Sequence, residues 1–194
     1  MVTVDTSEFY EGLSILVDGE PYTIIWFQHH KPGKGGAVMR TKLKHLRTGA
    51  IVERTFKSGE TFEEIKVERK KKTYLYNDGD TYYFMDEETY EQIPIDKKVL
   101  GKAVNFLTEN SSIDVIYLEN EIIGVELPPT VVLKVVATVP GVRGDTVSAS
   151  VMKPATVETG AVVQVPLFIK ENDMIRIDTV TGEYVERVSE GEAK

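Results

Sequence analysis

The residue whose type and surroundings best suit it to chemistry is Lys34. It is the one charged residue between Pro32 and Gly36 in the glycine-rich segment 31–36 (KPGKGG). Pro32 fixes one backbone angle, while the glycines permit positive φ and close approach of another molecule. A lysine at such a tight turn can project its ammonium into an anionic pocket, and a modifying enzyme can reach it. The alternative is an ordinary glycine-rich turn with a solvated lysine.

Cations gather around this segment, although the chain as a whole is acidic. Its 31 Asp and Glu residues outnumber its 23 Lys and Arg residues, which gives a net charge of −8. No acidic residue lies between Glu20 and Glu53, and that window holds Lys31, Lys34, Arg40, Lys42, Lys44, Arg47 and all three histidines of the chain. The pattern predicts a local anion-binding surface on an acidic protein. The alternative is a strand face that is basic and solvated.

Composition and spacing argue against most catalytic and metal chemistries. The chain has no cysteine, which excludes a thiol nucleophile and any cysteine-based metal site. Segment 31–36 fails the phosphate-loop pattern, because Lys34 is followed by glycine rather than serine or threonine. His29 and His30 are adjacent on a predicted strand, so they point to opposite faces and make poor joint metal ligands. We therefore expect a protein that is not an enzyme and uses neither a metal nor a cofactor.

Short strands must position these residues. Apolar, β-branched runs flank Asp18-Gly19, a pair typical of a hairpin. Segment 37–44 alternates apolar and polar residues, which places Arg40, Lys42 and Lys44 on one side of a strand. The spacing of these strands is typical of a small SH3-like barrel over residues 1–64.

The rest of the chain also reads as β-structure. Aromatic runs around segment 77–80 (NDGD) predict a second hairpin, and the acidic residues 86–88 are expected at a solvated turn. Apolar spacing over 97–107 predicts one helix with Asp96 as its N-cap. Pro128-Pro129 marks a boundary, after which five or so short strands are typical of an OB-type barrel. The basic run 69–72 is expected to be a solvated face.

The length and patterning also bear on location. No run of eighteen apolar residues exists, and the N-terminus has neither a basic start nor an apolar stretch typical of a secretory signal. The sequence therefore predicts a cytoplasmic protein without a membrane partner.

Four passages resemble the bacterial translation elongation factor P family. Segment 31–37 (KPGKGGA) and the basic strand after it resemble that family's first-domain loop, and segment 73–79 (TYLYNDG) resembles its second-domain hairpin. Stretches within 144–169 (GDT, KPAT and TGAVVQVPLFI) resemble its third domain, and segment 182–187 (GEYVER) resembles its C-terminal end. One departure is Asn172, where the family usually has glycine; asparagine tolerates a left-handed backbone, so the turn should survive.

The resemblance implies an all-β fold of three small β-barrel domains: an SH3-like domain over 1–64 and OB-type domains over 65–127 and 128–194. It implies an L-shaped, tRNA-like arrangement. It further implies a factor that binds the 70S ribosome between the P and E sites, next to peptidyl-tRNA, and rescues ribosomes stalled at consecutive prolines. A monomer suits that role.

In many family members a modifying enzyme extends the lysine that matches Lys34, by β-lysylation or with an aminopentanol group. The related archaeal and eukaryotic factor carries hypusine at the equivalent loop, and other bacterial members carry a rhamnosylated arginine. Lysine at position 34 excludes the arginine chemistry. The sequence leaves the choice among the lysine modifications, and an unmodified protein, open.

By resemblance, two groups of residues contact the ribosomal complex. The contacts to the CCA end and acceptor arm of the P-site tRNA fall on Lys31, Pro32, Gly33, Lys34, Gly35, Arg40, Lys42 and Lys44. The contacts toward the small subunit fall on Gly144, Asp145, Thr146, Tyr184 and Arg187. For Tyr184 and Arg187 the alternative is packing of the last strand.

Two other classes of function stay open. A generic RNA-binding protein in transcription or processing would need a basic groove with exposed aromatic residues on a barrel face, and the acidic second segment argues against it. An enzyme or scaffold unrelated to RNA would need a buried titratable cluster, of which the sequence shows no sign.

Overall fold

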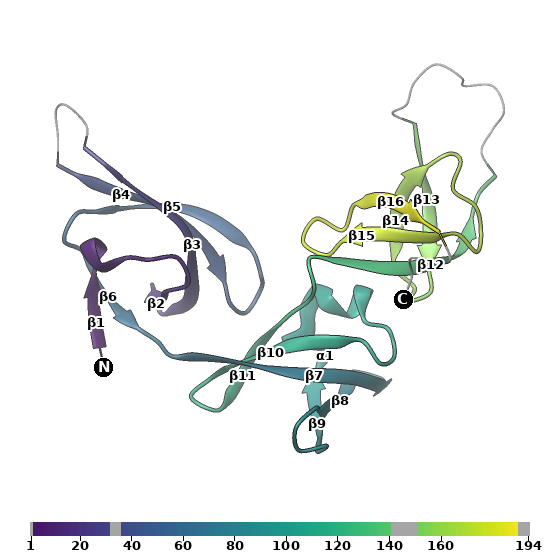
Figure 1. The fold of residues 1–194 in the computed structure, drawn as a ribbon, viewed down its shortest axis with the longest axis horizontal. Coiled ribbons are helices and arrows are strands. Elements are labelled where there is room, and N and C mark those ends of the chain that lie inside the picture. Colours follow the sequence, from purple (N-terminus) through teal and green to yellow (C-terminus); the bar gives the residue numbers. More distant parts are fainter. Residues whose placement is uncertain (1, 32–35, 141–150, 190–194) are drawn as a thin grey trace. The chain divides into compact units, whose positions relative to one another are not determined.

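The computed structural model describes residues 2–31, 36–140 and 151–189. The chain forms two compact units, residues 1–72 with 114–126, and residues 73–113 with 127–194. Nearly all regular structure is antiparallel strand, arranged in three sheets (Figure 1). The predicted all-β class is therefore confirmed. No helix among the described residues is long and apolar enough to cross a membrane.

The N-terminal sheet lies in the first unit and has the strand order β1-β6-β2-β3-β4-β5. Its elements are β1 (Val2–Asp5), the 3₁₀ turn η1 (Thr6–Glu8), β2 (Ser14–Val17), β3 (Glu20–His30), β4 (Val38–His45), β5 (Ile51–Lys57) and β6 (Thr61–Glu64). The predicted turn between β2 and β3 is confirmed: Asp18 and Gly19 both have positive φ, 54° and 82°, as a two-residue hairpin of right-handed twist requires. Ile15, Ile24 and Leu43 are fully buried beneath the sheet.

The middle sheet has the order β11-β10-β7-β8-β9. Its strands are β7 (Val67–Asp78), β8 (Thr81–Asp86), β9 (Gln92–Asp96), β10 (Ser112–Leu118) and β11 (Glu121–Glu126). The predicted hairpin around segment 77–80 is present as β7–β8, and β10 and β11 form a further hairpin. The acidic turn after β8 is also present, with the Asp86 carboxylate accepting from the backbone N–H groups of Glu88 (2.8 Å) and Thr89 (3.0 Å).

The predicted helix over 97–107 is only partly correct. Asp96 is its N-cap and accepts from the N–H of Lys98 at 2.7 Å. The α-helical part, α1 (Lys97–Leu100), ends after one turn because Gly101 adopts φ 53° and ψ −127°, outside the helical region. The chain continues as a 3₁₀ helix, η2 (Gly101–Phe106). The apolar spacing that suggested one long helix instead buries Leu100, Ala103 and Leu107 from two short ones.

The third sheet has the order β14-β13-β12-β15-β16 and lies in the second unit. Its strands are β12 (Thr130–Thr138), β13 (Met152–Val157), β14 (Val162–Pro166), β15 (Met174–Asp178) and β16 (Tyr184–Val188). Leu133, Val135 and Ile175 are fully buried in its core. Asn172 has φ 71°, so the left-handed backbone expected at this position is confirmed.

Two side chains fasten β12 to β13 next to residues 141–150. Lys153 is 5% exposed, and its ammonium donates to the backbone carbonyl of Val139 at 2.8 Å. The Thr138 hydroxyl donates to the carbonyl of Pro154 at 2.9 Å. Because a buried ammonium needs a hydrogen-bond acceptor, Lys153 fixes the path of the chain at Val139.

Candidate functional site

β4 is the central element of the predicted tRNA contact. It pairs with β3 on one side and with β5 on the other, so that Arg40 lies between Gln28 and Thr55, and Lys42 lies between Trp26 and Glu53. Met39, Thr41 and Leu43 are buried, whereas Arg40 and Lys42 are exposed. The predicted alternation along this strand is therefore confirmed, and two of its cations face outward from the N-terminal sheet.

Ion pairs separate the cations of the basic window into two classes. Lys42 Nζ lies 3.7 Å from the Glu53 carboxylate and 5.9 Å from the centre of the Trp26 ring. Arg47 lies 3.8 Å from Glu20. Arg40 and Lys31 are exposed and make no ion pair with the residues that the structure describes. These last two are thus available to an anionic partner without losing an internal one.

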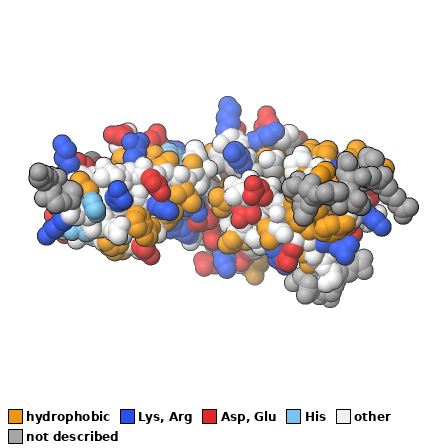
Figure 2. Space-filling model, turned by 90° about the horizontal axis from the view of Figure 1, so that it is seen from above, with side chains coloured by type: hydrophobic (Ala, Val, Ile, Leu, Met, Phe, Trp, Pro, Cys, Tyr) orange, Lys and Arg blue, Asp and Glu red, His pale blue; other side chains and the backbone are white. Residues whose placement is uncertain are grey.

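Sequence reasoning included His30 in the basic window but missed Lys57, which lies outside it. His30 on β3, Val38 on β4 and Lys57 on β5 are paired in register, so that His30 and Lys57 join the side of the sheet that carries Arg40. Both are exposed. Figure 2 shows Lys, Arg and His side chains at the left of the view, where β3 and β4 end. The turn at 48–49 could have revealed Lys57, because it sets the β4–β5 register.

Lys44 differs from its neighbours on β4. Its ammonium forms an ion pair with the carboxylate of Glu126 on β11, and Arg69 Nε donates to the other oxygen of that carboxylate at 3.2 Å. Burial acts to raise the pKa of Glu126, but the hydrogen bonds and charges of Lys44 and Arg69 outweigh it and hold the pKa below its ordinary value. Lys44 is therefore part of an internal bridge within the first unit.

The lowered pKa of Glu126 predicts a pH-dependent contribution to stability. A carboxyl group with a depressed folded-state pKa stabilises the fold above its unfolded pKa, and that stabilisation is lost as the pH falls through the folded pKa. We expect Glu126→Gln to lower the free energy of unfolding at neutral pH by on the order of 1 kcal/mol, after allowance for solvent screening. Denaturant titrations should show this difference shrink toward acid pH; a constant difference would contradict it.

The basic run 69–72 is exposed at Arg69, Lys70 and Lys71, as the sequence suggested, but not at Lys72. Arg69 bonds to Glu126, and Lys70 Nζ lies 5.3 Å from the centre of the Tyr117 ring. Lys72 is only 3% exposed. The expectation fails only at Lys72, whose side chain is buried on β7, a strand that has neighbours on both sides in its sheet.

At the C-terminal end, the packing alternative receives support. Tyr184 is half-buried against the hydrophobic core of the third sheet, and burial raises the pKa of its hydroxyl. Arg187 is exposed and lies 5.8 Å from the ring of Phe168, which is itself 55% exposed. Tyr184 and Arg187 therefore do not share one surface patch. Tyr184 packs inward, while Arg187 and Phe168 face solvent.

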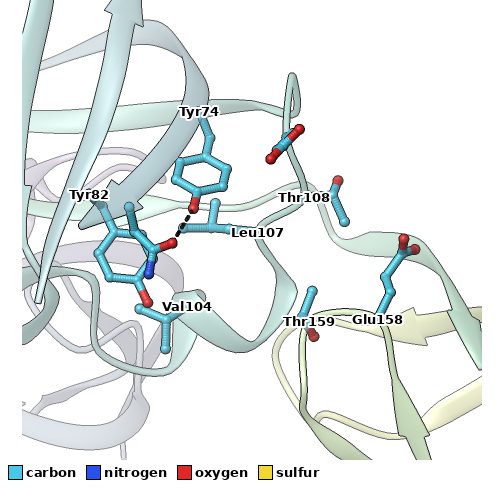
Figure 3. Close-up of a pocket in the computed structure, with 9 residues that line it drawn as sticks. Tyr74, Tyr82, Val104, Leu107, Thr108, Glu158 and Thr159 are labelled. Atoms are coloured by element: carbon cyan, nitrogen blue, oxygen red, sulfur yellow. Dashed lines mark hydrogen bonds between the residues drawn. The ribbon is translucent and has the colours of Figure 1, made fainter. Parts of the chain in front are cut away.

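A polar cavity of about 480 Å³ lies elsewhere in the second unit (Figure 3). It is lined by Tyr74, Asn77, Tyr82, Val104, Leu107, Thr108, Glu109, Glu158 and Thr159. The Tyr74 hydroxyl donates to the Asn77 side-chain oxygen at 3.4 Å, and burial is the main cause that raises the pKa of Tyr74. None of the residues that sequence reasoning assigned to a site lines this cavity.

Several predicted site residues lie outside the described part of the chain: Pro32, Gly33, Lys34, Gly35, Gly144, Asp145 and Thr146. Their assigned roles stay predictions. Among the residues that are described, no group of three or more His, Asp or Glu side chains is placed to hold a metal ion.

Comparison with known proteins gives the same order of domains as the sheets. Family models match residues 5–62 ("Elongation factor P (EF-P) KOW-like domain"), 67–125 ("Elongation factor P (EF-P) OB domain") and 131–187 ("Elongation factor P, C-terminal"). Elongation factor P of Endomicrobium trichonymphae is 56% identical over 184 residues, covering 95% of this chain and 99% of that protein. The chain belongs to the elongation factor P family.

A second relative agrees with this membership. Elongation factor P of Moorella thermoacetica is 54% identical over 184 residues, covering 95% of this chain and 99% of that protein. Among solved structures, the chain is similar to eukaryotic translation initiation factor 5A from Methanococcus jannaschii, with 24% identity, a TM-score of 0.46 and coverage of 64% of this chain and 93% of that one. The predicted resemblance and the SH3-like and OB-type fold class are confirmed, and the chain is a translation elongation factor.

Proposed function

We propose that this elongation factor P family member binds the ribosome between the P and E sites and promotes peptide-bond formation at consecutive prolines. The observation that carries the proposal is the exposed cationic side of β3, β4 and β5, with Arg40 and Lys42 at its centre, on a chain of net charge −8. An acidic body repels RNA, so a local cationic surface restricts how a polyanion can dock.

The proposed mechanism is positional rather than chemical. Proline restricts its own φ and disfavours the geometry of peptidyl transfer. Because ribosomal catalysis depends on positioning, a factor that holds the CCA end of the P-site tRNA in place can restore the rate without supplying a reacting group. We accordingly assign no catalytic residue and no cofactor to this chain.

Two contact regions follow from this mechanism. Segment 31–35 reaches the CCA end, with Lys34, extended by a modifying enzyme, as its cationic arm. Arg40 and Lys42, joined by Lys57, hold the RNA backbone as contacts that read no base sequence. Since Lys44 already bridges to Glu126, its predicted contribution to the tRNA contact is the one least supported by the fold.

At the other end of the chain, residues 144–146 and Arg187 are proposed to contact the small-subunit side. Arg187 is exposed and lies against the open ring of Phe168, an arrangement that suits stacking on an unpaired base. We further propose three domains, with boundaries near residues 64 and 127, that act as one monomer in the cytoplasm.

Reconstituted translation of a template with consecutive prolines tests this function. Added protein should raise the rate of the proline–proline step and leave a proline-free template unaffected. Its ribosome affinity should fall steeply with salt, with a log–log slope of roughly −0.7 for each phosphate contact. A chain that binds free RNA as tightly as ribosomes, or whose ribosome affinity ignores salt, would favour a generic RNA-binding protein instead.

A further inference from the structure

The far end of β4 is held by a hairpin that lies 70 or more residues away in sequence. Residue 46 follows β4 directly, and its side chain packs with those of Ile116 and Ile123 on β10 and β11; Leu46, Ile116 and Ile123 are 3%, 2% and 2% exposed. The Leu46 N–H also donates to the carbonyl of Pro21 at 2.9 Å, which ties this point to β3. All of these residues belong to the first compact unit.

Gly124 on β11 allows this contact to be close. A β-carbon added at Gly124 would overlap the backbone oxygen of Leu46 and lie 3.5 Å from the Cα of Arg47. The φ of Gly124 is not in the left-handed region, so an alanine would suit its backbone angles. The glycine is required by space alone, and the obstacle is backbone that cannot rotate away.

Ion pairs of Glu126 add a polar contact beside the apolar contact of Leu46. Its carboxylate takes Lys44 from β4 on one oxygen and Arg69 from β7 on the other. A half-buried carboxylate shared by two cations is directional, because each oxygen has its own donor. The two contacts hold the end of β4, one at Lys44 and the other at Leu46, the first residue after the strand.

A small change of angle at this end of β4 produces a larger displacement at its other end, next to the proposed site. The eight-residue β4 spans about 25 Å, and segment 31–36 precedes its other end. A rotation of about 2° at the gripped end would displace the opposite end by about 1 Å over that length. Misplacement of this size can cost a positioned reaction roughly a hundredfold in rate.

We propose that the β10–β11 hairpin is a brace that fixes the direction of β4, and that Gly124 and Glu126 are positioning residues for the exposed cationic side of β3, β4 and β5. Both residues lie on β11, outside the strands β3, β4 and β5 that carry the proposed RNA contact. The proposal rests on the proposed function for its activity readout, and on the geometry of the first unit alone for its structural readout.

Distance measurements test the geometry without reference to activity. The chain lacks cysteine, so spin labels at Thr55→Cys on β5 and Glu121→Cys on β11, both exposed positions, report only the chosen pair. The distance distribution should be narrow in the parent chain and in Glu68→Gln, a matched removal of an exposed carboxylate that pairs with Lys70 at 3.4 Å. It should broaden or shift in Gly124→Ala and in Glu126→Gln.

The rate of the proline–proline step then distinguishes a positioning role of Glu126 from a purely electrostatic effect of its charge. Removing a carboxylate near a cationic surface should strengthen RNA binding if only charge matters. The brace predicts the opposite sign: Glu126→Gln and Gly124→Ala should slow the proline–proline step by roughly tenfold or more, while Glu68→Gln does not. Circular dichroism and thermal unfolding should show both variants folded; Arg69→Gln serves as a second, milder variant if one is not.

Each outcome has a distinct meaning. Unchanged distance distributions would overturn the brace. The spin-label distances could change in both variants while the rescue of stalled ribosomes stays at the parent rate, or Glu126→Gln could rescue them faster. Either result would overturn the role of Gly124 and Glu126 in positioning. If the parent chain itself fails to rescue stalled ribosomes, the proposed function fails, while the distance measurement still decides the brace.

Discussion

Lys34→Ala is expected to abolish the rescue of ribosomes at consecutive prolines while leaving the fold intact. The substitution removes both the cation and the amine that a modifying enzyme would extend. We expect the rate of the proline–proline step to fall tenfold or more, toward the rate without factor, as the loss of a positioning contact would cause. The free energy of unfolding should stay within the range of an ordinary surface substitution, about ±0.5 kcal/mol.

A charge-preserving variant and a distant control sharpen this test. Lys34→Arg keeps a cation but not the modifiable amine, so it should rescue only if charge alone suffices. Lys66→Ala, at an exposed position outside the basic window, should behave as the parent chain does. Intact mass and peptide mapping of the natively expressed protein would show whether Lys34 is modified. Full activity of Lys34→Ala would show that segment 31–36 is an ordinary turn.

Arg40→Gln combined with Lys42→Gln is expected to weaken ribosome binding and to flatten its salt dependence. Both side chains are exposed, and Arg40 has no ion-pair partner among the described residues. Loss of two phosphate contacts should reduce the magnitude of the log–log salt slope by roughly 1.4 to 1.8. Binding measured at several salt concentrations checks the slope directly.

The stability of this double variant should change little. Lys42 gives up only a long ion pair with Glu53 and a contact of about 0.5–1 kcal/mol with the Trp26 ring. Lys98→Gln with Lys102→Gln removes the same charge from exposed positions of the second unit and should keep the parent slope. An equal loss in both double variants would show that net charge, not the β4 surface, governs binding.

Local signals in the sequence were enough to predict most hairpins. Asp18-Gly19 and the Gly-containing segment 77–80 fix tight turns through the backbone angles that their residues accept, so the strands around them follow. Asn172 was placed correctly for the same reason. β9 was missed because Pro94 breaks the strand pattern; as an edge strand it can tolerate a residue without an N–H donor.

Interactions over long sequence separations could not be predicted in this way. Lys44 and Glu126 are 82 residues apart, and nothing local to either one indicates the other. Lys57 is a different case: it reaches the cationic surface through the register of β5, which the turn at 48–49 sets. Burial of Lys72 depends on the neighbours of β7 in its sheet, which the run of four basic residues conceals.

The fastening of β12 to β13 by Lys153 and Thr138 has a thermodynamic consequence for residues 141–150. These bonds hold the chain on both sides of residues 141–150. The entropic cost of bringing the two held points together grows only with the logarithm of the number of residues between them, about 0.6 kcal/mol for each doubling. Insertions or deletions there should therefore be cheap for the barrel. The barrel therefore places little constraint on how many residues the chain has between Val139 and Lys153.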